Sequence, residues 1–166
     1  MAYTRKRTAK RTRPKDRTCY ETAVYLLQFR DQSEKDLTRK LKEREYAEKE
    51  IEEAMERLRD YEYVNDENLA DELFEAYRRR AQYGDAYIHQ KLKLKGLATE
   101  KHLQLEEEIE MAAALLQKKW GMSPKLRTDF KKSVSFLLRR GFSHDAVMTV
   151  MHEMDFEETE IGRAHV

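Results

Sequence analysis

The sequence predicts an all-α protein built from three tandem three-helix repeats. Its 166 residues include only five glycines and two prolines, whereas an all-β chain needs turn residues roughly every eight to twelve positions. Apolar residues recur three and four positions apart along most of the chain, which gives each expected helix one face to bury. One spacing between apolar residues also recurs at three helix ends. We therefore expect an elongated array in which each repeat touches mainly its neighbours.

The first repeat is expected to span residues 17–63. Its first helix runs from about Arg17 to Phe29. Ser33 can cap the second helix, which ends near Tyr46, and the third helix runs from about residue 47 to 60. The spacing predicts these buried residues: Tyr20, Ala23, Val24, Leu27, Leu37, Leu41, Ile51, Met55 and Leu58.

The second repeat is expected to span residues 64–107. Asn65 or Asp66 can cap its first helix, because a short side-chain oxygen accepts from otherwise unpaired first-turn amides. Gly84 and Gly96 are expected just past helix ends, where a left-handed residue closes the last turn. A third helix begins near Thr99, and we expect a break within the following glutamate run, the alternative being one long helix. The apolar face of the first helix is predicted to be Leu69, Ala70, Leu73, Phe74, Tyr77 and Ala81.

The third repeat is expected to span residues 108–156. Ser123 and Pro124 open a helix with a cap residue followed by proline at its first position. Gly141 closes this helix and Ser143 caps the last one. The predicted buried residues of the two helices are Phe130, Val134, Leu137, Leu138, Val147, Val150, Met151 and Met154.

The two ends of the chain are expected to lie outside the repeats. Residues 1–16 have no apolar periodicity and are predicted to be disordered. Residues 157–166 are interpreted as a tail, because Glu160–Val166 reads like the translation of a common sequencing adapter. On that interpretation the natural chain can continue beyond this point.

Three pairs of residues carry the repeat spacing. Each pair has a leucine followed five positions later by a large apolar residue, and the three second members lie 51 and 45 positions apart. Intervals of this size are typical of stacked helical units, none of which can bury its apolar face alone. The pairs are Leu41 with Tyr46, Leu92 with Leu97, and Leu137 with Phe142.

Charge is unevenly placed along the chain. Residues 1–17 hold eight basic residues and one acidic residue, so the rest of the chain holds 25 basic (33 − 8) and 31 acidic (32 − 1) residues. The basic arm suggests contact with a polyanion, and a solvated tail explains it equally well. Within the repeats, the second helices are basic and a cluster of arginines ends the Leu69 helix. The cations expected to bind a partner are Arg39, Lys40, Arg44, Arg78, Arg79, Arg80, Lys91, Lys93, Lys95, Lys131, Lys132, Arg139 and Arg140.

Stacking would align these cations in a stripe suited to an acidic protein surface or a phosphate backbone. The alternative is pairing with glutamates of neighbouring helices, where each exposed pair contributes only about 0–1 kcal/mol. We favour the stripe, because three units repeat the pattern.

The residues predict no catalytic site, metal or cofactor. Cys19 is the single cysteine and is expected to be a small buried thiol. No two histidines lie four positions apart, as a helical metal pair requires. His144 and His152 could form a surface metal site, although ordinary exposed polar side chains explain them better. No glycine-rich phosphate loop is present.

No apolar run is long enough to span a membrane and the first residues do not read as a secretion signal, so we expect a cytoplasmic monomer that is not an enzyme.

The central segment resembles the signature of RecX, the bacterial regulator of the RecA recombinase. The similarity covers about residues 19–154. Glu45 stands where the family usually has glycine, and Asn65 where aspartate is commoner. The residues that carry the similarity are Tyr63, Asp66, Leu69, Ala70, the arginine run, Tyr83, Gly84, Ile88, Leu92 and Gly96, with Gly141 and Phe142 in a flanking motif.

The resemblance implies three tandem three-helix repeats in a curved module. It also implies binding along the groove of the RecA–DNA filament, which would limit filament growth, ATPase activity and strand exchange in DNA repair, recombination and the SOS response. RecX-like proteins are not enzymes. Two rival functions stay open. One is direct binding of single- or double-stranded DNA through residues 5–17 and the basic stripe, and the other is a helical scaffold for an unrelated partner.

Overall fold

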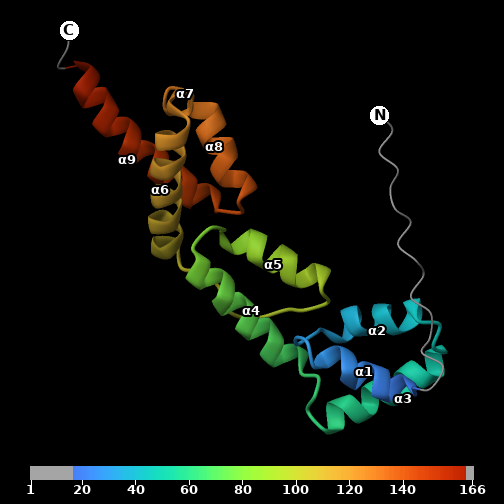
Figure 1. Ribbon diagram of the computed structural model, residues 1–166. Helices are drawn as coiled ribbons and strands as arrows, with labels where there is room; N and C mark the ends of the chain where they lie inside the picture. The colour runs from blue at the N-terminus through green and yellow to red at the C-terminus, as the bar shows by residue number, and fades with distance from the viewer. Residues whose placement is uncertain (1–16, 164–166) are drawn as a thin grey trace, which may run out of the picture. The chain divides into compact units, whose positions relative to one another are not determined.

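The protein is all-α in a computed structural model that describes residues 17–163, with side chains described for 17–154. This confirms the predicted fold class (Figure 1). The expected disordered arm, residues 1–16, and the last three residues lie outside the described part. The helices of the described part are α1 (Cys19–Leu27), α2 (Glu34–Glu43), α3 (Glu48–Asp60), α4 (Asp66–Arg80), α5 (Asp85–Leu94), α6 (Leu105–Met122), α7 (Pro124–Arg127), α8 (Phe130–Arg139) and α9 (His144–Arg163).

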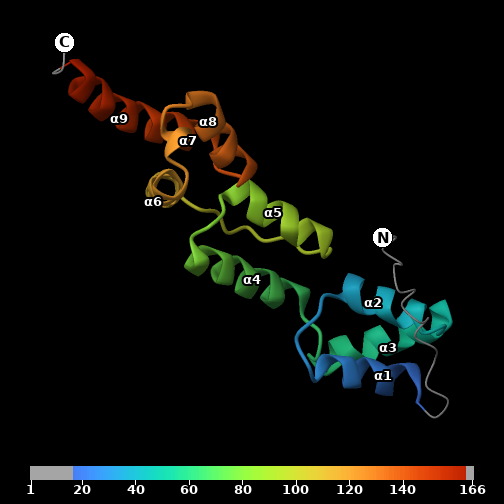
Figure 2. The same ribbon diagram turned by 45° about the horizontal axis from the view of Figure 1, so that its top comes forward.

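The helices belong to two compact units. The first unit comprises the described residues up to Leu69 together with Lys95–Leu97, and the second comprises Ala70–Leu94 and the described residues from Ala98 onward. In the first unit α1, α2 and α3 pack against one another, as Figure 2 shows. Their core confirms most of the predicted residues, but Leu26 is buried and Leu27 only half-buried. The buried members are Cys19, Ala23, Leu26, Leu37, Leu41, Tyr46, Ile51, Ala54, Met55, Leu58 and Val64.

The second unit contains a three-helix core in which α9 packs against both α6 and α8 (Figure 1). Short α7 lies between α6 and α8 in the chain, and a polar relay holds it in place. The indole N–H of Trp120 donates to the Ser133 hydroxyl (3.0 Å), which donates to the Leu126 carbonyl (2.9 Å). The buried members of this core are Ala112, Leu116, Leu137, Phe142, Val147, Val150 and Met151.

Helix α6 shows that the expected break within the glutamate run is wrong. The helix runs without interruption from Leu105, and residues 95–104 before it contain no helix, so the third helix expected near Thr99 is absent. The glutamate run forms the first turn of α6, because a carboxylate of the run accepts a hydrogen bond from a backbone N–H at the helix start. Glu107 accepts from the backbone N–H of Gln104 (2.9 Å), and carboxylates in a first turn are also favoured by the helix dipole. Glu108 is buried and accepts from the N–H of Ser143 (2.7 Å) at the start of α9.

Two other helix boundaries differ from the prediction. The helix expected from Pro124 onward divides into α7 and α8, because Asp129 caps a new helix by accepting from the N–H of Lys132 (3.0 Å). Phe130 and Leu138 of α8 are exposed rather than buried. Helix α9 extends to Arg163, so the predicted tail from residue 157 is helical as far as the structure describes it. Of the two proposed caps for α4, Asn65 accepts from the N–H of Asn68 (3.1 Å).

The repeated helix ends are confirmed. All six residues of the three spaced pairs are buried, and the residue before each second member has a positive φ: 66° at Glu45, 72° at Gly96 and 85° at Gly141. In the first and third repeats the N–H of the second member donates to the carbonyl of its leucine, at 3.3 Å for Tyr46 and 3.4 Å for Phe142. This bond is the longer of the two that define the Schellman helix end. The sequence repeat is therefore a repeat of one backbone turn.

Gly84 does not close a helix, contrary to the prediction. Ala81 takes the left-handed conformation after α4 (φ 52°), and Gly84 instead precedes α5. The N–H of Gly84 donates to the carbonyl of Arg140 (2.8 Å), and the N–H of Ala86 donates to the carbonyl of Gly141 (3.3 Å). A Cβ at Gly84 would overlap the carbonyl group of Gly141. Glycine is needed here because two backbones meet.

We expect Gly84→Ala to destabilise the protein, because the added methyl group must separate the start of α5 from the Gly141 turn. The loss should be at least about 2 kcal/mol in the free energy of unfolding, the scale of overpacking plus two weakened hydrogen bonds. Gly121→Ala is the matched control. A Cβ at helical Gly121 meets nothing within 4 Å, so that substitution should be neutral or stabilise by about 0.5–1 kcal/mol. Urea unfolding measures both, and equal midpoints would contradict the argument.

Glu45→Gly is expected to stabilise the first unit. Glu45 is exposed and holds a left-handed conformation at the end of α2, which costs a residue with a Cβ about 1–2 kcal/mol. Part of the gain is offset by the greater freedom of glycine in the unfolded chain, so we expect about 0.5–1 kcal/mol. Glu45→Ala, which removes the carboxylate but keeps the Cβ, should leave the urea midpoint nearly unchanged. Stabilisation by alanine as large as that by glycine would assign the effect to charge instead.

Candidate functional site

The predicted cations fall into two groups. Some are at least half-buried and bonded to groups that stabilise the fold, and the others lie at the surface. Arg44 is buried and donates to the carbonyl of Lys40 (3.0 Å). The ammonium of Lys40 donates to the Gln32 side chain (2.5 Å). Burial lowers the pKa of Lys40, and the nearby positive charges of Arg30 and Arg39 lower it further. These two members of the predicted stripe therefore serve the structure of the first unit.

Arg78 is also committed to the structure, in the second unit. Its guanidinium donates to the Glu75 carboxylate (3.0 Å) and the His102 carbonyl (3.1 Å), and lies 3.5 Å from the Glu107 carboxylate. Only about a third of the side chain is exposed. Arg78 belongs to α4, whereas His102 lies in the segment before α6 and Glu107 in α6 itself. Arg78 therefore connects α4 to α6 and to the segment that leads into it. It is a joint between elements rather than a free cation.

The remaining predicted cations are exposed or half-exposed. Several take part in surface ion pairs, such as Arg39 with Glu43 (2.8 Å), Lys95 with Asp36 (3.5 Å) and Lys132 with Asp129 (3.8 Å). Exposed pairs of this kind are weak and easily exchanged for a partner's anion. The exposed members in the second unit are Arg79, Arg80, Lys93, Lys131, Lys132 and Arg139.

Three tyrosines of the second unit lie among these cations. Tyr83 and Tyr87 stack face to face with ring centroids 3.8 Å apart, and Tyr77 meets both edge-on at 6.3 Å. Each ring carries one cation over its face: Arg80 over Tyr77, Arg140 over Tyr83 and Lys91 over Tyr87, at 5.8, 5.5 and 5.2 Å. We call these six residues the tyrosine–cation cluster.

The turn after α8 brings the cluster together. Arg140 donates to the carbonyl of Gln82 (3.1 Å), and its own carbonyl accepts from Gly84. These contacts place Arg140, the residue directly after α8, beside rings that flank the start of α5. Cations held over aromatic rings retain their charge, and half-exposed rings offer apolar area next to it. Such a surface suits an acidic protein segment or a phosphate backbone.

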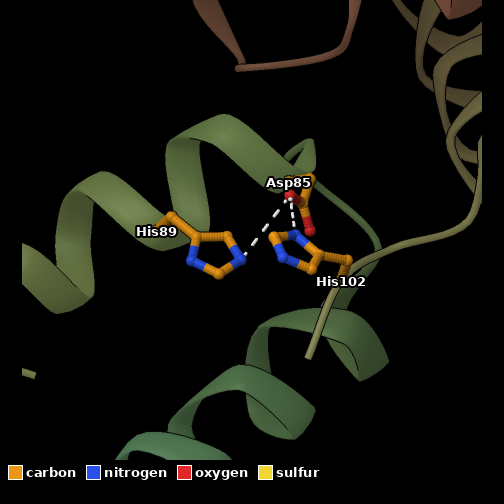
Figure 3. A group of neighbouring side chains, drawn as sticks. All are labelled: Asp85, His89 and His102. Carbon is orange, nitrogen blue, oxygen red and sulfur yellow. Dashed lines mark hydrogen bonds and ion pairs between the residues drawn. The ribbon is translucent and has the colours of Figure 1, made fainter. Parts of the chain in front are cut away.

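A second polar group in this unit consists of Asp85, His89 and His102 (Figure 3). Asp85 and His89 lie one turn apart on α5, and His102 lies in the segment before α6. One oxygen of Asp85 is 2.8 Å from Nδ1 of His102 and 3.5 Å from Nε2 of His89. Sequence reasoning missed this group because it looked for pairs of histidines, whereas the i, i+4 partner of His89 is an aspartate. The spacing Asp85-x₃-His89 was available, but the position of His102 depends on tertiary structure.

The other chemical predictions can be compared with the described residues. Cys19 is buried, as expected. His144 and His152 belong to no group of three potential metal ligands among the described side chains. None of the helices in the described ranges combines the length and the apolar composition needed to cross a bilayer.

Comparison with known proteins gives a consistent relationship. The first three-helix domain of RecX matches residues 19–58, and the third three-helix domain of RecX matches residues 106–151. Regulatory protein RecX of Actinobacillus pleuropneumoniae serotype 5b is 34% identical over 155 residues, which cover 86% of this chain and 96% of the relative. The protein of the same name from Trichlorobacter lovleyi is 29% identical, covering 78% of this chain and 90% of its own. The crystal structure of RecX from Lactobacillus salivarius superposes with a TM-score of 0.71 at 25% identity, covering 83% and 95% of the two chains.

The division between structural and free cations predicts different effects of two neighbouring substitutions. Arg78→Ala removes hydrogen bonds to Glu75 and to the His102 carbonyl, so we expect a loss of about 1–3 kcal/mol in the free energy of unfolding. Arg79→Ala, at an exposed position, should change it by less than about 0.5 kcal/mol. Chemical unfolding of both variants gives the comparison. Similar midpoints would show that Arg78 is not a structural joint.

Proposed function

The chain belongs to the RecX family, and we propose that it regulates the RecA recombinase by binding along the RecA–DNA filament. Such binding would limit filament growth and thereby lower RecA ATPase activity and strand exchange. The relatives from Actinobacillus pleuropneumoniae and Trichlorobacter lovleyi are named regulatory proteins, and this chain covers 96% and 90% of their lengths. A role as a regulator that acts by binding, rather than by catalysis, fits this relationship.

The tyrosine–cation cluster is the observation that carries the proposal. It offers three cations and three half-exposed rings on one unit, and the exposed Arg79 and Arg139 are the chain neighbours of Arg80 and Arg140. A recombinase filament presents both acidic side chains and DNA phosphates, and either can pair with such cations. We therefore place the principal contact on α4, α5 and α8. Arg44, Lys40 and Arg78 are left out, because Arg44 is buried, Lys40 donates to the buried Gln32 side chain, and Arg78 donates to Glu75 and the His102 carbonyl. Arg140 is kept, because its guanidinium lies over the half-exposed Tyr83 ring although it also donates to the Gln82 carbonyl.

Direct DNA binding is the alternative function. Residues 1–17 carry eight basic side chains, and a basic arm binds phosphates with affinity that falls steeply as salt rises. In this case the protein would compete with RecA for DNA rather than bind the filament. The two functions differ in whether inhibition needs the arm.

RecA ATPase on single-stranded DNA, titrated with substoichiometric amounts of the protein, tests the proposal. The full chain and a form without residues 1–17 are both expected to inhibit. Inhibition by the full chain alone, weakened strongly by added salt, would favour DNA competition. A lack of effect from the folded full chain would exclude RecA regulation under these conditions.

The double variant Arg79→Glu/Arg139→Glu is expected to inhibit RecA at least about fivefold less well than the unchanged protein. Like charges brought together at a contact surface cost about 1 kcal/mol or more, and 1 kcal/mol corresponds to a factor of about five. Lys49→Glu/Lys118→Glu makes the same change in net charge at two exposed positions outside the predicted set. This control should inhibit like the unchanged protein. Equal weakening in both variants would reveal an effect of net charge rather than of the proposed surface.

A further inference from the structure

We propose that Asp85, His89 and His102 form a binding site for a divalent transition-metal ion of the zinc type. The ligand atoms would be one carboxylate oxygen of Asp85, Nε2 of His89 and Nδ1 of His102. These atoms all lie within 4.8 Å of one another. The site is separate from the surface proposed to contact RecA and does not depend on that function.

The distances suit a single small ion. Zinc binds imidazole nitrogen and carboxylate oxygen at about 2.0–2.2 Å, so two ligands of one tetrahedral ion lie roughly 3.3 Å apart. The distances from the Asp85 oxygen to the two histidine nitrogens, 2.8 and 3.5 Å, lie on either side of this value. The two histidine nitrogens lie no more than 4.8 Å apart, so movement of the exposed His102 side chain would bring all three ligand atoms to distances that suit the ion.

The carboxylate is already oriented for this role. The second oxygen of Asp85 accepts from the backbone N–H of Leu103 (2.7 Å), which leaves the first oxygen directed at both imidazoles. Bonds of this kind fix the direction of a metal ligand and raise its affinity. Asp85 and His89 are four positions apart on α5, so the helix itself holds the two in register.

The kind of ligand selects the kind of ion. Two imidazoles and one carboxylate suit zinc and its neighbours, whereas calcium and magnesium prefer oxygen ligands throughout. Three protein ligands leave a position for water, and the His102 side chain is 60% exposed, so an ion can enter from solvent. Binding would replace the contact between Nε2 of His89 and the Lys101 carbonyl (2.9 Å), which is a modest competing interaction.

The ion would add a link between α5 and the segment before α6, which now contact each other through Asp85, His89 and His102. His102 lies in the segment without helix before α6, and its carbonyl also accepts from Arg78. An ion held by α5 and His102 would therefore fix this segment and stabilise the second unit. Metal that binds the folded but not the unfolded chain stabilises it by RT ln(1 + c/Kd) at a free metal concentration c, so the unfolding midpoint rises with the metal concentration.

Binding of Zn²⁺ and Co²⁺ to the tag-free full chain tests the site. We expect one ion per chain, and visible d–d absorption of bound Co²⁺ without the charge-transfer band of a thiolate, which would indicate Cys19. His102→Ala and His89→Gln should each weaken binding at least tenfold. His102 is exposed, so its substitution should preserve the helical circular dichroism. His144→Ala, at an exposed histidine outside the group, should bind like the unchanged protein.

Zinc should also raise the thermal unfolding midpoint of the unchanged protein and of His144→Ala, but not that of His102→Ala. The proposal is overturned if the unchanged protein binds no Co²⁺, if His102→Ala binds as well as the unchanged protein, or if His144→Ala weakens binding as much as His102→Ala does. Because these readouts need no RecA, their failure leaves the proposed function standing, and failure of that function leaves the metal site standing.

Discussion

The close approach of two backbones at Gly84 and Gly141 is the contact on which the surface of the second unit depends. Gly141 takes a positive φ to end the turn after α8, and Gly84 has no Cβ to keep that turn away from α5. The hydrogen bond from Gly84 to the Arg140 carbonyl then brings the guanidinium of Arg140 beside Tyr83. Gly84 and Gly141 therefore determine the position of Arg140, the residue after α8, relative to Tyr83.

Carboxylates that bond to distant backbone amides form a second common feature of the fold. Asp66 accepts from the N–H of Glu34 at the start of α2 (3.0 Å), and Glu108 does the same for Ser143 at the start of α9. Burial raises the pKa of Asp66, and this bond opposes the rise by favouring the ionised form. Each carboxylate lies in the first turns of its own helix while it satisfies the first turn of another. Some of the acidic residues are thus structural rather than solvated surface.

The sequence was sufficient to predict the all-α class, the three repeated helix ends and most of the core of the first unit, because these depend on local patterns. Leucine followed five positions later by a large apolar residue encodes one turn, and even Glu45 adopts the left-handed conformation that this turn requires. The predictions of local structure were wrong where a residue far away in the sequence determines that structure. Nothing within the glutamate run reveals that Glu108 caps α9, and the surroundings of Gly84 do not reveal that Gly141 lies against it. The first fact follows from the packing of α6 against α9, and the second from the contact between the turn after α8 and the start of α5.

The candidate site was predictable to the extent that it depends on composition. The sequence shows where the cations are, but it does not show which of them stabilise the fold and which are exposed. Adjacent arginines differ in this respect. Arg78 is on the side of α4 that meets Glu107 and the His102 carbonyl, whereas Arg79, about 100° further around the helix, is exposed. The same joint therefore contains Arg78, the segment before α6 and the proposed metal ligands. An ion at Asp85, His89 and His102 would reinforce the contacts of Arg78, while Arg79 would stay available to a partner. Two neighbouring arginines of one helix can thus serve different purposes, because Arg78 stabilises the fold while the charge of Arg79 remains available to a partner.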